Sequence, residues 1–108
     1  MKKSINSIFC VIILIFFTNS VSSDINFFYK GIKSYRQHDY ILAKEYFEKA
    51  AAIGDNEAQF LLGRMYFDGN SLKIDHVQSL KWFFISHSSG LIIAKRYIKK
   101  LKLRMSME

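Results

Sequence analysis

The sequence predicts an all-α protein, built as a short α-solenoid of antiparallel helix pairs. Three observations predict this class: internal similarity at a constant offset, apolar residues at helical spacing, and no strand-like alternation of apolar and polar residues. The 108-residue chain is long enough for one domain, and half of it is apolar, with ten Phe and six Tyr. This composition favours a packed core over disorder.

The internal similarity has an offset of 36 residues throughout. Each copy begins with an aspartate, continues with a pair of aromatic residues, and then carries small residues at fixed places. The matching positions are Asp39 and Asp75, Tyr46-Phe47 and Trp82-Phe83, Ala50 and Ser86, Gly54 and Gly90, and Ala58 and Ala94. Several coincidences at one offset indicate a structural repeat.

Each copy predicts a helix after its aspartate. Asp39 and Asp75 are N-cap residues, while Gly54 and Gly90 suit the left-handed position that ends a helix. The residues between them share one helix face, at i, i+3, i+4 and i+7: Ala43, Tyr46, Phe47 and Ala50, then Ser79, Trp82, Phe83 and Ser86.

Three further helices are predicted at about 25–37, 57–68 and 91–105. Gly31 and Gly63 lie inside the first two of these, where a glycine costs about 1 kcal/mol relative to alanine. We therefore expect a neighbouring helix to approach closely at both glycines. His38 stands where a tight turn is expected, and histidine tolerates a positive φ better than most residues.

The stretch AQFLLGRMYFDG at 58–69, followed by Asp75, Trp82-Phe83 and Gly90, resembles the SEL-like repeat family, a branch of the tetratricopeptide superfamily with a period near 36. The chain departs from the family pattern at Ser71, Ser79, Ser86 and His87, three of which replace the usual alanine. The first copy is similar to an ordinary tetratricopeptide repeat. The resemblance implies a repeat domain at 24–108, with unit one at about 25–54, unit two at 55–90, and a capping helix at 91–105.

The N-terminus predicts a signal peptide at 1–23. Lys2 and Lys3 precede an apolar run at 8–17, and small residues before Asp24 suit signal peptidase. The run is about half the length of a membrane-spanning helix, although an uncleaved anchor is the alternative. We expect a periplasmic or secreted protein, and because Cys10 is the only cysteine, its mature form contains no disulfide.

The sequence favours no catalysis, no cofactor and no metal. His38, His76 and His87 lack metal-ligand spacing, and no nucleophile motif or phosphate-binding glycine loop is present. The resemblance raises one enzymatic alternative, since some cysteine-rich secreted SEL-like proteins are linked to β-lactam binding or hydrolysis. This chain lacks their disulfide framework, which argues against that function.

The resemblance implies that the first helix of each pair lines a concave face that binds a protein or peptide. The residues carried over are Phe28, Ile32, Tyr35, Arg36, Phe60, Arg64 and Phe67. Aromatic residues edged by arginine are typical of interaction hot spots. The alternative is that these aromatics are buried against the C-terminal helix or against a second copy in a homo-oligomer.

The last predicted helix is strongly basic, with Lys95, Arg96, Lys99, Lys100, Lys102 and Arg104. These residues form either a solvated face or a contact with an anionic membrane, which is the second functional class considered. Nucleic acid is not expected as a partner, because the chain is predicted to be exported.

Overall fold

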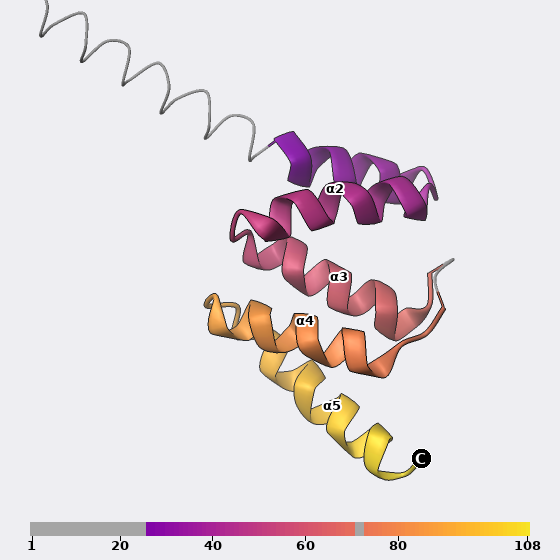
Figure 1. Cartoon of the computed structure of the whole chain (residues 1–108), viewed down its shortest axis with the longest axis vertical. Helices are drawn as coiled ribbons and strands as arrows, with labels where there is room; N and C mark the ends of the chain where they lie inside the picture. The colour runs from indigo at the N-terminus through magenta and orange to yellow at the C-terminus, as the bar shows by residue number, and fades with distance from the viewer. Residues whose placement is uncertain (1–25, 71–72) are drawn as a thin grey trace, which may run out of the picture.

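A computed structural model describes residues 26–70 and 73–108, and within these ranges the only regular secondary structure is helical. A helix at residues 26–36 is followed by α2 (Tyr40–Ala52), α3 (Asn56–Asp68), α4 (His76–Ser88) and α5 (Ala94–Ser106). Consecutive helices stack on one another in chain order (Figure 1). The predicted helical solenoid is confirmed, while the predicted signal peptide lies outside the described residues.

The same tight turn joins the helices at three places. The second residue after each helix end is left-handed, with φ of 61° at His38, 94° at Gly54 and 108° at Gly90. The next N–H then reaches back to the carbonyl five residues earlier, as in Asp55 to Ala50 at 3.2 Å. This is the Schellman pattern, and it reverses the chain within two or three residues.

Aspartates begin the next helices as predicted. Asp39, Asp55 and Asp75 each accept a hydrogen bond from the backbone N–H three residues later, at 3.2, 3.0 and 3.0 Å. Each therefore satisfies a donor that the first turn of a helix leaves without a partner. In the first two turns the capping aspartate directly follows the left-handed residue, so stop and start signals are adjacent.

The two mid-helix glycines receive aromatic rings. A Cβ added at Gly31 would lie 2.5 Å from the Phe47 ring, and one at Gly63 would lie 2.7 Å from the Phe83 ring. Phe47 and Phe83 are themselves fully buried. The expected close approach is therefore confirmed, and the group that approaches each glycine is a phenylalanine ring from the second helix of the pair.

The serines of the second copy are buried and hydrogen-bonded. The Ser79 hydroxyl donates to the Gly63 carbonyl at 2.7 Å, and the Ser86 hydroxyl donates to the Asn56 carbonyl at 2.8 Å. These serines stand where the family pattern usually has alanine. In the structure they tie α4 to α3, so they do not leave unsatisfied polar groups in the core.

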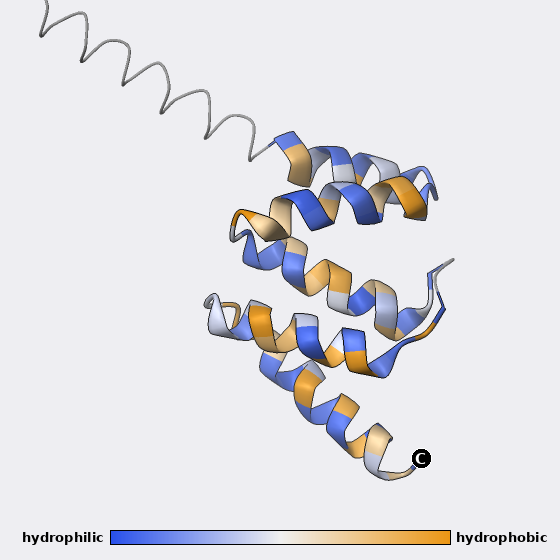
Figure 2. Cartoon of the chain, in the orientation of Figure 1, coloured by the Kyte–Doolittle hydropathy of each residue, from blue (hydrophilic) through white to orange (hydrophobic). Residues whose placement is uncertain are grey.

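Helix α5 begins three residues later than the predicted 91. The Leu91 N–H is used by the preceding turn, where it donates to Ser86 at 3.0 Å, and residues 92 and 93 form a further turn. Figure 2 shows blue and orange residues alternating along α5, and its apolar side contacts α4. Ala94, Ile98 and Leu101 are its buried residues.

Candidate binding groove

An apolar hollow of about 370 Å³ opens where the helix at 26–36, α3 and the start of α5 meet. Phe28 and Ile32 come from the first of these, and Phe60 and Leu61 from α3. The segment before α5 contributes Leu91 and Ile93, and Glu57 lies at the edge. We call these seven residues the groove. It faces solvent, since Ile93 is 50% exposed and Phe28, Ile32 and Phe60 are half-buried.

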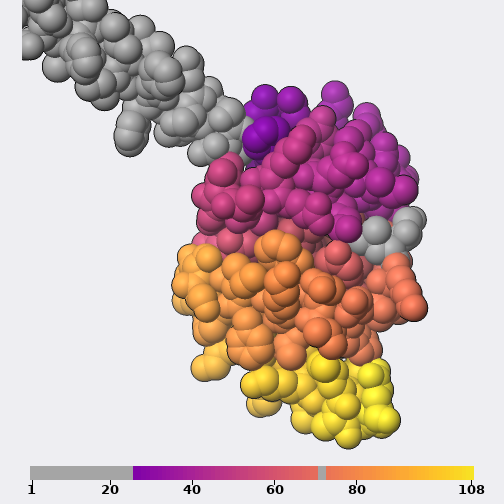
Figure 3. Space-filling model, viewed as in Figure 1, coloured from indigo at the N-terminus to yellow at the C-terminus, as the bar shows by residue number. Residues whose placement is uncertain are grey.

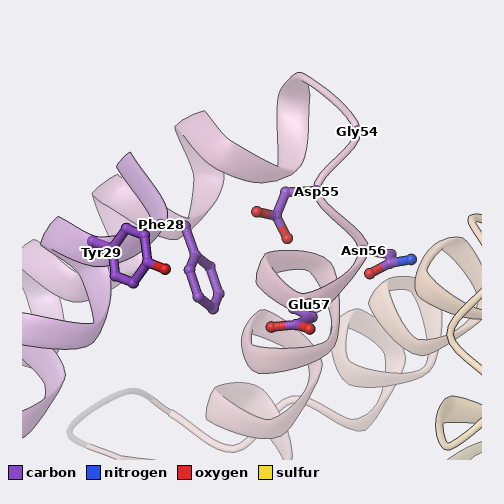
Figure 4. A pocket seen from close by; sticks show the side chains of 6 residues that line it. All are labelled: Phe28, Tyr29, Gly54, Asp55, Asn56 and Glu57. Atoms are coloured by element: carbon purple, nitrogen blue, oxygen red, sulfur yellow. The ribbon is translucent and has the colours of Figure 1, made fainter. Parts of the chain in front are cut away.

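A second hollow, of about 450 Å³, adjoins the groove and shares Phe28 and Glu57 with it. Tyr29 and the turn at 54–56 complete its lining (Figure 4). In Figure 4 the Phe28 ring points toward the space between its own helix and the start of α3, where the Asp55 and Glu57 carboxylates lie. The surface is therefore apolar on one side and acidic on the other.

The core of the first unit holds one wall of the groove in place. Phe28 packs against the buried Phe47 ring at a centroid distance of 6.2 Å, and its remaining surface faces the hollow. The tight turn after α4 brings Leu91 and Ile93 to the opposite wall. The phenylalanine is thus held by the core and still available to a partner.

Helix α5 covers the rest of the concave side. Tyr97 lies 5.1 Å from the Phe60 ring, 5.1 Å from Phe83 and 6.2 Å from Phe67. The Arg104 guanidinium and the Lys100 ammonium lie over Phe67 at 4.7 and 5.4 Å from its ring. Phe67 is only 8% exposed. It is therefore buried against the C-terminal helix, which was the alternative to a place in the binding surface.

Three other residues singled out in the sequence lie outside the groove. The Tyr35 hydroxyl accepts a hydrogen bond from the Asn70 side chain at 2.6 Å, which joins the first helix to the end of α3. Arg64 pairs with Asp68 at 3.4 Å on the surface of α3, and Arg36 is exposed. The structure therefore brings together Phe28, Ile32 and Phe60, and separates Tyr35, Arg36 and Arg64 from them.

Leu61, Leu91 and Ile93 were missed by sequence reasoning. Leu61 belongs by its spacing to the apolar stripe of the helix predicted at 57–68, and residues 91–93 were assigned to a helix that begins only at Ala94. The sequence contained one signal for this part of the groove, namely the adjacent Ile92 and Ile93 shortly after Gly90. Two large apolar residues in a tight turn are either covered by a neighbouring element or exposed to solvent. They are 80% and 50% exposed.

The described residues contain no group of three or more His, Cys, Asp or Glu side chains placed to hold a metal ion. His38 Nδ1 lies 2.9 Å from the Tyr40 hydroxyl within the first turn, and His76 Nδ1 lies 3.2 Å from Glu108. His87 is exposed at the end of α4. In the same part of the chain, every helix is too short or too polar to cross a membrane.

One titratable group outside the groove has a displaced pKa. The Lys44 ammonium donates a hydrogen bond to the Tyr66 hydroxyl oxygen, which raises the pKa of Lys44 above its usual 10.5, and the Glu48 carboxylate at 3.5 Å acts in the same direction. A raised pKa means that the contact stabilises the fold fully at pH values below the unfolded pKa, and that this stability is lost as pH rises through the folded pKa. The lysine thus stays charged at neutral pH and links α2 to α3.

Comparison with known proteins agrees with this geometry. The Sel1 repeat matches residues 26–55 and 56–86, more than half of the chain, so the chain belongs to the Sel1 repeat family. Repeats of this family generally mediate protein–protein interactions.

Two curated relatives named "Putative beta-lactamase HcpC", from Helicobacter pylori strains J99 and 26695, are each 42% identical to this chain over 43 residues. The match covers 40% of this chain and 15% of each relative. The shared part is therefore about one repeat in length.

Proposed function

We propose that this chain is an exported protein-binding module whose groove takes an apolar segment of another protein. The observation that carries the proposal is the convergence of Phe28, Ile32 and Phe60 with Leu91 and Ile93 in one solvent-facing hollow. Apolar clusters of this kind on a soluble surface mark binding sites. The repeat family supports the same class of function.

The acidic residues at the edge of the groove indicate the charge of the partner. Glu57 is exposed at the boundary of both hollows, and Asp55 lies beside it in the second. A segment that places aliphatic or aromatic side chains in the groove and a lysine or arginine beside Glu57 would complement both sides. We propose such a segment as the ligand, and we propose no catalytic step.

Export is part of the proposal. It rests on the basic, apolar and small-residue order of positions 1–23, which is that of a cleaved signal peptide. Cleavage before Asp24 would place the new N-terminus two residues before the first described helix. A periplasmic or secreted location then determines which proteins the groove can meet.

Site-specific photo-crosslinking tests the function. A photoreactive phenylalanine analogue at Ile93, in the groove, is compared with the same analogue at Ile41, which is 66% exposed and outside the groove. We expect a crosslink to a second protein from position 93 alone, and we expect Phe28→Ser to reduce it.

Two results would contradict the proposal. Equal crosslinks from positions 93 and 41 would show that the groove is not the binding surface. A crosslink from position 93 only to a second copy, with sedimentation showing a dimer, would assign the groove to a homo-oligomer instead.

A further inference from the structure

Helix α5 repeats the register of α3. The buried positions of α3 reappear 36 residues later as buried positions of α5: Ala58 and Ala94, Leu62 and Ile98, and Met65 and Leu101. Helix α5 is therefore the first helix of a third unit. Within the described residues no second helix follows to cover its outer side.

The same register places Lys99 where α3 has Gly63. In both complete units this position is a glycine that receives a phenylalanine ring from the second helix, at Gly31 and at Gly63. Lys99 is exposed, and a helix packed there would have to bury its ammonium group. Burying an unpaired charge is strongly unfavourable, so this side of α5 is not built to receive another helix of the repeat or a stacked second copy.

The outer side of α5 combines positive charge with exposed apolar residues. Helix α5 contains six basic residues and no acidic ones. Arg96, Lys99 and Leu103 share one face at i, i+3 and i+7. Leu103 is 59% exposed, and Ile92 and Met107 at the two ends are 80% and 86% exposed.

A shallow hollow on this side shows how the two kinds of residue are arranged. Ile98 and Leu103 form its apolar floor, and Lys95, Lys99 and Lys102 surround them, enclosing about 410 Å³. Lys102 also lies over the Phe84 ring, and the other cation–ring contacts of α5 join Lys100 and Arg104 to Phe67. Lys95 and Lys99 are thus left to face solvent.

We propose that the outer face of α5, defined by Lys95, Lys99, Lys102, Leu103 and Met107, docks on an anionic lipid surface. Lysines around exposed aliphatic residues are typical of helices that lie in the headgroup region of a membrane. Protein interfaces are instead depleted in lysine and enriched in aromatic residues, which this face lacks. Figure 3 shows α5, in yellow, at the very end of the stack, where a flat surface can reach it.

This contact is independent of the groove. The groove lies on the side where the first helix, α3 and the turn before α5 meet, and shares no residue with the α5 face. The module can therefore hold a protein segment while it rests on a membrane. The formal net charge of the full chain is +7, and without Lys2 and Lys3 of the predicted signal peptide it is 7 − 2 = +5, which acts in the same direction as the local charge.

Co-sedimentation of the full chain with vesicles tests the proposal. Vesicles of phosphatidylcholine alone are compared with vesicles that contain one third phosphatidylglycerol, at low and high salt. The apolar run at 8–17 contributes equally in every variant, so differences between variants report on the helices. We expect anionic vesicles to bind more protein, and the excess to fall as salt rises.

The decisive comparison uses two variants with the same loss of charge. Lys95→Gln with Lys99→Gln should lower binding to anionic vesicles by roughly fivefold per lysine. Lys33→Gln with Lys73→Gln, which removes two exposed lysines elsewhere, should lower it much less. Leu103→Ser should also weaken binding, and circular dichroism confirms that each variant is folded.

Two results would overturn the proposal. An equal loss in both double variants would mean that net charge, and not the α5 face, determines binding. Absence of any preference for anionic vesicles, together with Lys99-dependent binding to polyglutamate, would assign the face to an acidic protein.

Discussion

At the scale of single residues, the connections of this stack depend on left-handed positions at His38, Gly54, Gly69 and Gly90 and on three capping aspartates. His38, Gly54 and Gly90 reverse the chain, and the aspartates supply the hydrogen bonds that begin the next helix. His38 is the exception among them, because it carries a Cβ at a φ of 61°. Its ring contacts Tyr40, which gives a bulky residue at this place a packing partner.

Asp75 offers a direct measure of capping. Asp75→Ala removes the acceptor for the Gln78 N–H, and we expect the free energy of unfolding to fall by about 1 kcal/mol. Asp75→Asn keeps a capping oxygen and should retain most of the stability. Urea denaturation of both variants checks this, and equal losses would show that the cap is not what Asp75 provides.

Gly63 tests the close packing of α3 against α4. Gly63→Leu places a side chain where the Phe83 ring already lies 2.7 Å from a Cβ. Overpacking costs about 1–3 kcal/mol, against at most ~1 kcal/mol gained in helix propensity, so we expect a lower melting temperature.

A double-mutant cycle separates this clash from other effects. Phe83→Leu makes room at the same place, so the losses of Gly63→Leu and Phe83→Leu should be less than additive. Strict additivity, or an unchanged melting temperature for Gly63→Leu, would show that the ring does not constrain this glycine.

At the scale of helices, the sequence predicted every described helix. Which residues of one helix are buried by another helix is seen only in the structure. Helical spacing identifies the apolar face of α3 but does not say whether Phe67 meets solvent or α5. Tyr97 decides this, because it reaches three aromatic rings at once. For the same reason, Phe60 is both a groove residue and a neighbour of α5.

Tyr97 is therefore the residue that attaches α5 to the stack. Tyr97→Ala removes contacts with Phe60, Phe67 and Phe83, and we expect a loss of about 2–4 kcal/mol in the free energy of unfolding. Binding of a hydrophobic dye should increase as the rings become exposed.

Ile92→Ala is the control, because Ile92 is 80% exposed and should change stability by about 0.5 kcal/mol or less. A Tyr97→Ala protein as stable as Ile92→Ala would mean that α5 is held in place by other contacts.

At the scale of the whole molecule, repeat stacks gain stability from neighbours, and this one exposes two different surfaces, the groove between its helices and the outer face of α5. The first helix presents Phe28 to the groove, while the last presents lysines. Of the seven binding residues predicted from the sequence, Phe28, Ile32 and Phe60 meet in the groove. Phe67 is kept out of the groove by α5, and Tyr35 and Arg64 by their contacts with Asn70 and Asp68. Residue spacing along a helix does not predict such contacts.

The export prediction concerns the same scale. Protein recovered from the exported fraction should begin at or near Asp24, which intact mass measures directly. Full-length chain in the membrane fraction would instead indicate a retained anchor.

The central claim, that the groove binds a protein segment, is tested most directly by equilibrium binding of the crosslinked partner to matched variants. Ile93→Ser truncates a groove residue that is 50% exposed, and Ile41→Ser truncates an isoleucine outside the groove that is 66% exposed. If the groove is the binding surface, Ile93→Ser raises the dissociation constant by about fivefold or more, since an interface hot spot contributes over ~1 kcal/mol. Ile41→Ser should leave it unchanged. Equal dissociation constants for the wild type and both variants would contradict the claim.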